Sequence, residues 1–123
     1  MFKHIDHLAL HVTDVAATAK FYMETFGFKK ISEASGAGGP SRVFIQLGDT
    51  LIELTQRAQA DPMSGFHFCL QATDFDADLA GLRARGLPVV TEATPTTPRG
   101  PLDQGSQRAV FRGPHGELIE IRG

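Results

Sequence analysis

The chain has 123 residues, of which 41% are hydrophobic and 21% are charged, so its apolar side chains suffice for the core of one ordinary domain. Its 12 basic and 14 acidic residues give a formal net charge of −2, and no run exceeds two basic residues, which argues against a nucleic-acid partner. The sequence shows no signal-like segment, no long apolar stretch and a single cysteine, so we expect a cytoplasmic protein without membrane contact or an intrachain disulfide.

The first half of the chain predicts a strand, a helix and three further strands. Residues 5–13 alternate in polarity as a strand does, and Asp14 is a favoured helix N-cap. Apolar residues then recur at helical spacing until Gly27, a residue type that commonly follows a helix end. The remaining strands, of which the last two should form a hairpin, are expected at residues 28–35, 42–47 and 51–55.

The second half repeats this order after a polar connector. A strand at residues 66–73 should precede a helix that Asp74 or Asp76 caps and Gly86 ends. Residues 93–105 are rich in proline, glycine and threonine and predict a long loop that lies over the site or at its rim. The further strands are expected at residues 87–91, 107–112 and 117–121.

One domain built from two βαβββ modules follows from this order. The modules span residues 1–57 and 65–123, and residues 58–64 connect them. Neither module can readily bury a core alone, so the two should pack together. In each module one sheet face is apolar and should pack on the helix, while the other is more polar. The predicted fold is therefore α+β, with a curved mixed sheet forming a cup and the helices on its outer face.

Two short patterns occur once in each half and carry metal-binding residue types at matching places. DHLALHVTD at 6–14 matches FHFCLQATD at 66–74, and GDTLIEL at 48–54 matches GELIEI at 116–121. An internal repeat is stronger than any single motif. Strand alternation places each histidine and glutamate on the polar face of its module. Imidazole nitrogen and carboxylate oxygen bind borderline divalent metals, and we expect one such ion at the four repeated residues His7, Glu53, His67 and Glu120.

Other residues on the polar face are candidates for contact with a small-molecule substrate. His11 shares a face with His7, and Gln71 is its counterpart in the repeat. Cys69 is expected to be a small pocket-wall residue, since no basic neighbour in sequence lowers its pKa. Within the loop at 93–105, Arg99 is the best candidate to meet an anionic substrate.

Five segments of the chain resemble the vicinal oxygen chelate superfamily, also called the glyoxalase/bleomycin resistance/dioxygenase superfamily. They are DHLALHVTD, FYMETFGF, GDTLIEL, GFHFCLQATD and GPHGELIEI. The resemblance covers essentially the whole chain and implies paired βαβββ modules around a divalent ion. It also places the repeated histidines and glutamates on the family's four ligand positions.

The ligand set is similar to that of glyoxalase I, or lactoylglutathione lyase. In bacterial glyoxalase I an arginine four residues past the first ligand, and an asparagine four residues past the first glutamate, contact glutathione. Here these positions hold His11 and Arg57, so both count as substrate-binding candidates that depart from the glutathione pattern.

The resemblance implies proton transfer through an enediolate. Four protein ligands leave two positions of a six-coordinate ion for vicinal substrate oxygens, and the ion acts as a Lewis acid. Glu120 is the expected general base and Glu53 its counterpart. Mixed nitrogen and oxygen ligands leave Ni²⁺, Co²⁺, Zn²⁺ and Mn²⁺ open. The expected activity is that of a lyase or isomerase acting on a small 2-oxo-derived substrate.

We also expect a homodimer, because each module exposes a sheet edge and such edges tend to be covered.

Three alternatives stay open. An epimerase of a 2-acyl thioester uses the same enolate chemistry. A ring-cleaving dioxygenase would use iron, typically with two histidines and one carboxylate, and a fourth ligand at Glu53 argues against it. The non-enzymatic alternative is a drug-binding module of the bleomycin resistance type, which needs no metal.

Overall fold

The structure is a computed structural model that describes residues 1, 3–100 and 105–123. It forms two compact units, Met1–Asp61 and Pro62–Gly123. Each unit has the order βαβββ and a mixed four-stranded sheet, so the predicted α+β class and the paired modules are confirmed. No helix of the described residues is long and apolar enough to cross a membrane.

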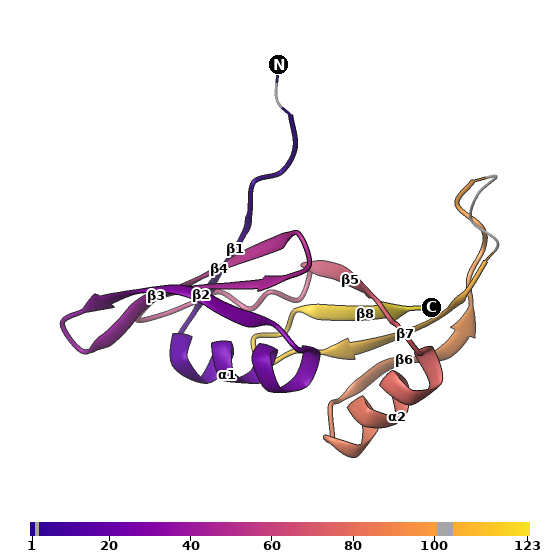
Figure 1. The fold of residues 1–123 in the computed structure, drawn as a ribbon. Coiled ribbons are helices and arrows are strands. Elements are labelled where there is room, and N and C mark those ends of the chain that lie inside the picture. The colour runs from indigo at the N-terminus through magenta and orange to yellow at the C-terminus, as the bar shows by residue number, and fades with distance from the viewer. Residues whose placement is uncertain (2, 101–104) are drawn as a thin grey trace. The chain divides into compact units, whose positions relative to one another are not determined.

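The first unit places its helix against one face of its sheet (Figure 1). The strand order is β1-β4-β3-β2, in which β1 and β4 are parallel and the other pairs are antiparallel. Its elements are β1 (Leu8–Val12), α1 (Val15–Phe26), β2 (Lys29–Gly36), β3 (Gly39–Leu47) and β4 (Thr50–Gln56).

The ends of α1 follow the sequence signals closely. The Asp14 side chain accepts a hydrogen bond from the backbone N–H of Ala17, which satisfies one of the unpaired donors of the first turn. Gly27 adopts φ 77°, a left-handed conformation that favours glycine, and its N–H closes on the carbonyl of Met23. Both expected boundaries of this helix are confirmed.

The core of the first unit lies between α1 and the apolar sheet face. Register places Leu10, Leu54 and Val43 side by side on β1, β4 and β3, and all three are buried. Tyr22 of α1 is fully buried and contributes a large apolar area. Alternation therefore turns Ala9, His11, Glu53 and Thr55 to the opposite face.

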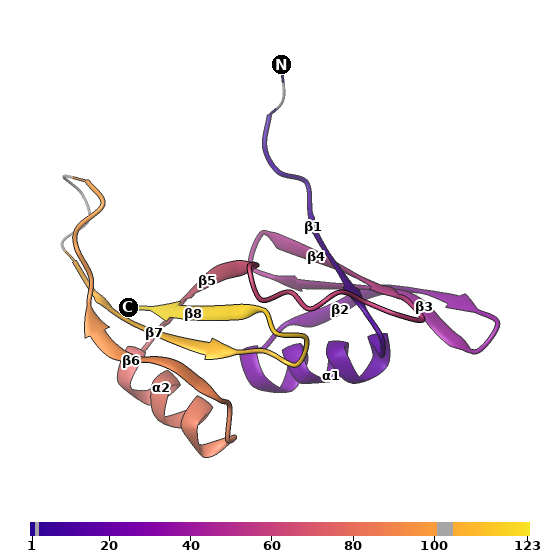
Figure 2. The ribbon, with the colours of Figure 1, turned by 180° about the vertical axis from the view of Figure 1, so that it is seen from behind.

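The second unit repeats this topology, with strand order β5-β8-β7-β6 (Figure 2 shows the reverse side). Its α2 begins after Asp74, which accepts from the N–H of Ala77, so Asp74 rather than Asp76 is the cap. Register places the buried Ile119 between Phe68 and Phe111. The elements are β5 (His67–Gln71), α2 (Phe75–Ala84), β6 (Val89–Pro95), β7 (Gln107–Arg112) and β8 (Leu118–Arg122).

Two boundaries differ from the sequence expectation. The register of β1 with β4 begins with Leu8 opposite Ile52, so residues 5–7 precede the ladder and the strand is shorter than 5–13. In the second unit β6 continues to Pro95, which pairs with Gln107, so residues 93–95 belong to a strand and not to the loop. Proline is tolerated there because β6 is an edge strand. Residues 101–104 of the expected loop lie outside the described residues.

Candidate metal centre

In the first unit, His7 and Glu53 lie together on the polar side of the sheet. His7 immediately precedes β1, and Glu53 is in the middle of the neighbouring β4. His7 Nε2 is 3.5 Å from Glu53 Oε2, and the Glu53 side chain is 18% exposed. The first half of the expected donor set is thus brought together by a parallel strand pair.

Asp6 sets the orientation of the His7 ring. Asp6 Oδ2 lies 2.9 Å from His7 Nδ1, and this hydrogen bond lowers the pKa of the exposed Asp6 carboxyl. An ionised carboxylate accepts only, so Nδ1 is the donor. In the neutral imidazole Nε2 then carries the lone pair, on the side that faces Glu53. Metal-binding histidines commonly have such a carboxylate on their other nitrogen.

Glu53 is held from two further sides. Thr55 Oγ1 donates to Glu53 Oε1 at 2.8 Å, and Arg42 Nε of β3 lies 3.9 Å from the same oxygen. The ring of Phe44, opposite Glu53 in the register, meets the His7 ring edge to face at 6.1 Å. The His7–Glu53 pair is therefore fixed by packing as well as by hydrogen bonds.

In the second unit, His67 and Glu120 form the matching pair. His67 Nε2 is 3.0 Å from Glu120 Oε2, and Arg108 Nη1 of β7 approaches the same oxygen at 3.3 Å. The Glu120 side chain is only 10% exposed. The Glu120 carboxylate is therefore largely shielded from water and is approached by two nitrogen groups.

Cys69 lies opposite Glu120 in the β5–β8 register. Burial raises the pKa of its thiol, and the neighbouring Glu120 raises it further, while Arg122 and Arg99 act in the opposite sense. The thiol is therefore protonated at neutral pH and is a poor nucleophile. Its place in the wall of a pocket stays a prediction.

The remaining candidates are distributed over both units. His11 is exposed and pairs with Thr55 in the register, one step beyond Glu53. Arg57 follows β4, and its N–H bonds to the carbonyl of Val12. Gln71 is on β5 beside Arg122, and the charge of Arg99 reaches the Cys69 thiol.

Arg42 and Arg108 are functional candidates that the sequence expectation missed. Each is two residues before the residue that pairs with the candidate glutamate, on β3 and β7 respectively, and each contacts that glutamate. A signal does exist in the sequence, since RVF at 42–44 and RAV at 108–110 occupy equivalent places in the two halves.

The donor chemistry of each pair fits a divalent metal. One imidazole nitrogen and one carboxylate oxygen are what Ni²⁺, Co²⁺, Zn²⁺ and Mn²⁺ accept. Across residues 1, 3–100 and 105–123, the structure brings no three His, Cys, Asp or Glu side chains into one cluster that could hold an ion. The structure thus shows two matched two-donor sets, and the four-ligand centre stays a prediction.

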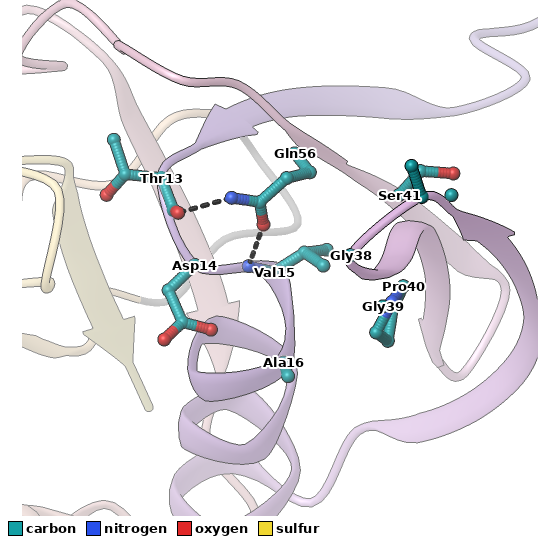
Figure 3. A pocket seen from close by; sticks show the side chains of 11 residues that line it. Thr13, Asp14, Val15, Ala16, Gly38, Gly39, Pro40, Ser41 and Gln56 are labelled. Carbon is teal, nitrogen blue, oxygen red and sulfur yellow. Dashed lines mark hydrogen bonds between the residues drawn. The ribbon is translucent and has the colours of Figure 1, made fainter.

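Two cavities of the first unit differ in their relation to these residues. One of about 240 Å³ is lined by His7, Asp6 and Asp49 among others. Another of about 460 Å³ lies at the start of α1 and under the β2–β3 hairpin (Figure 3), and no predicted site residue lines it. There the Gln56 side chain accepts from the N–H of Val15 at 2.8 Å and donates to the carbonyl of Thr13. The helix end is thus already capped, which leaves little to attract an anion.

Comparison with known proteins identifies the class. The model of the Glyoxalase/Bleomycin resistance protein/Dioxygenase superfamily matches residues 4–121, and the chain belongs to this superfamily. A search of curated proteins finds no match to the chain.

Solved structures of several functional kinds share the fold. VPC_CASS1 from the mobile metagenome of V. Pseudocholerae is 27% identical with a TM-score of 0.76, and the match covers 99% of this chain and 95% of that chain. Lactoylglutathione lyase from Agrobacterium tumefaciens is 25% identical with a TM-score of 0.68, covering 97% and 92%. TnmS3, an antibiotic binding protein from Streptomyces sp. CB03234, is 24% identical with a TM-score of 0.69, covering 98% and 95%, and shows likeness of fold alone.

Proposed function

We propose that the protein is a metal-dependent lyase or isomerase of the glyoxalase I type, acting on a small 2-oxo-derived substrate. The observation that carries this proposal is the repeated pair of imidazole and carboxylate, 3.5 Å apart in one half and 3.0 Å apart in the other, at equivalent places in the two sheets. Superfamily membership and the likeness to a lactoylglutathione lyase support it.

In this proposal His7, Glu53, His67 and Glu120 hold the ion. A bound divalent ion supplies Lewis-acid stabilisation of the negative charge that develops on vicinal substrate oxygens. Glu120 takes the proton from the carbon next to the carbonyl and returns it to the neighbouring carbon. His67 and Arg108 both contact Oε2 of Glu120, so we assign the moving proton to Oε1. Glu53 offers the corresponding carboxylate from the other half.

Metal content tests the ligand assignment. We expect wild-type protein to bind one divalent ion per chain in elemental analysis and titration, and His7→Ala and His67→Ala to lose most of it. His11→Ala is the matched control because His11 is exposed near the same glutamate, one register step beyond Glu53. Equal metal content in all four proteins would show that the two histidines are not ligands, and a wild-type protein that binds no metal would favour the metal-free drug-binding alternative.

Turnover tests the role of Glu120. Methylglyoxal with glutathione is the first substrate, followed by other thiols because His11 and Arg57 differ from the glutathione-binding pattern. Glu120→Gln should keep a folded site and lose turnover by about 10²–10⁴-fold, the usual effect of removing a general base. Glu33→Gln, which changes an exposed carboxylate paired with Lys30, is the control.

Solvent deuterium entering the α position of the substrate would report the proton transfer itself. Full activity of Glu120→Gln would contradict the assigned base. Oxygen consumption during turnover would instead favour the dioxygenase alternative, and racemisation of a 2-acyl thioester would favour the epimerase.

A further inference from the structure

The face of the second unit that carries Glu120 also carries a group of arginines. The register places Gln71, Arg122 and Arg108 side by side on β5, β8 and β7. This row is one two-residue step, about 6–7 Å along the strands, beyond the row that contains Cys69 and Glu120. Donor-bearing side chains therefore form a row next to the candidate base.

Three arginines act on two side chains that are opposite each other in the β5–β8 register, Glu120 and Cys69. Arg108 Nη1 bonds Glu120 Oε2 at 3.3 Å, and the charges of Arg122 and Arg99 both reach the thiol of Cys69. Arg122 is 7% exposed and comes from the sheet, whereas Arg99 comes from the segment that follows β6. One guanidinium group thus bonds the carboxylate of Glu120, and the charges of two others act on the neighbouring Cys69 thiol.

The equivalent row of the first unit has a different charge. Its members are His11, Thr55 and Arg42, so it holds one permanent cation where the second unit holds two. The nearby His7 is bonded to Asp6, and Asp49 lines the same cavity. The excess of positive charge is therefore a property of the second half, and it breaks the symmetry of the repeat.

We propose that Arg99, Arg108 and Arg122 bind an anionic group of the substrate, a carboxylate or a phosphonate or phosphate, next to Glu120. This inference rests on the proposed function for the identity of the face as the substrate site. Guanidinium groups bind such oxyanions through paired, charge-assisted hydrogen bonds. The substrate is then a small anion whose charged group lies about 6–7 Å, one two-residue step along the strands, from the carbon that loses its proton.

Anion binding by these arginines would orient the substrate as well as increase its affinity. Binding the anion fixes the substrate along the strands, so that its reacting carbon faces Glu120 and not Glu53. Arg108 contacts Glu120 directly, so a bound anion also draws this guanidinium towards itself and away from the carboxylate that must accept the proton.

Anion binding by the metal-free protein tests the proposal independently of turnover. Inorganic phosphate, methylphosphonate and acetate are titrated in turn and followed by ¹H–¹⁵N spectra of the backbone and of the arginine Nε–H groups. We expect saturable shifts on β7 and β8, and a dissociation constant raised at least about tenfold in Arg99→Gln and in Arg108→Gln. The probe with the lowest dissociation constant, among phosphate, methylphosphonate and acetate, identifies the class of oxyanion.

Arg42→Gln is the matched control because it removes the same charge at the equivalent place in the other half. The proposal is overturned if Arg42→Gln weakens binding as much as Arg108→Gln, or if Arg99→Gln and Arg108→Gln bind phosphate like the wild type. Arg108→Lys keeps the charge and removes the forked geometry, so partial retention of affinity would support oxyanion pairing should Arg108→Gln fold poorly. Loss of metal binding with anion binding intact would contradict only the proposed function.

Discussion

At the scale of single residues, each candidate glutamate lies between one histidine and one arginine, and the details of the two halves differ. Glu53 has Thr55 as an additional hydrogen-bond donor, whereas Glu120 is deeper and has the Cys69 thiol opposite it. Depth increases the strength of each electrostatic contact because less water screens it. Within the proposed reaction, this difference in exposure favours Glu120 as the base and gives Glu53 the more solvated, supporting role.

The carboxylate behind His7 leads to a prediction about metal affinity. Asp6→Asn replaces a charged acceptor on His7 Nδ1 by a neutral amide, which weakens the electron donation from Nε2 and frees the ring. We expect metal affinity to fall about 10–100-fold, as is usual when such a partner is lost. A competition titration with a chelating indicator measures this change.

Asp49→Asn is the control for this prediction, because Asp49 lines the same cavity and its substitution removes the same charge. An equal loss in both variants would mean that the local charge, and not the hydrogen bond to His7, sets the affinity.

At the scale of elements, local signals explain what sequence reasoning found and what it missed. Asp14, Gly27 and Asp74 act on their own backbone neighbours, so the helix ends are readable from the sequence. The extension of β6 to Pro95 depends on pairing with Gln107, a partner twelve residues away that no local pattern specifies. Strand ends are set by the partner strand, which is why β1 also begins later than expected.

The same reasoning applies to the candidate site. Alternation within each strand predicts that His7 and Glu53 share the polar face of one module, and that His67 and Glu120 share that of the other. Arg42 and Arg108 required the register of a third strand, since only the pairing of β3 with β4 and of β7 with β8 brings them to the glutamates. Whether the four ligands meet at one ion depends on how two modules pack, which strand patterns do not encode.

The end of α1 provides a stability prediction. Gly27→Ala forces a side chain into a left-handed conformation at φ 77° and should lower the free energy of unfolding by about 1 kcal/mol. Urea unfolding followed by circular dichroism measures the loss. Gly38→Ala is the control, because its added Cβ meets open space and its φ lies outside the left-handed range, so it should change stability much less. Equal effects of the two changes would contradict the role assigned to the helix end.

At the scale of the whole molecule, the outer edges of the two sheets share an unusual feature. β2 and β6 are edge strands, and the ladder of each is interrupted by a register shift, between Lys30 and Ser32 and between Val89 and Thr91. The residues at these shifts are apolar and exposed, with Ile31 at 56% and Val90 at 43%. A bulge discourages continuous pairing with another strand, so apolar side chains, and not a shared ladder, would supply the contact here.

We therefore expect a homodimer in which these edge residues are covered. Sedimentation velocity at micromolar concentration should show a dimer for the wild type and a shift towards monomer for Ile31→Lys or Val90→Lys, because burying an unpaired ammonium group at an interface costs several kcal/mol. Lys29→Glu is the control, because it changes a charge on the β2 edge strand at a position outside the bulge. A wild-type monomer, or a dimer that both substitutions leave intact, would show that these edges do not form the interface; in the latter case the β1 and β5 edges are the next to test.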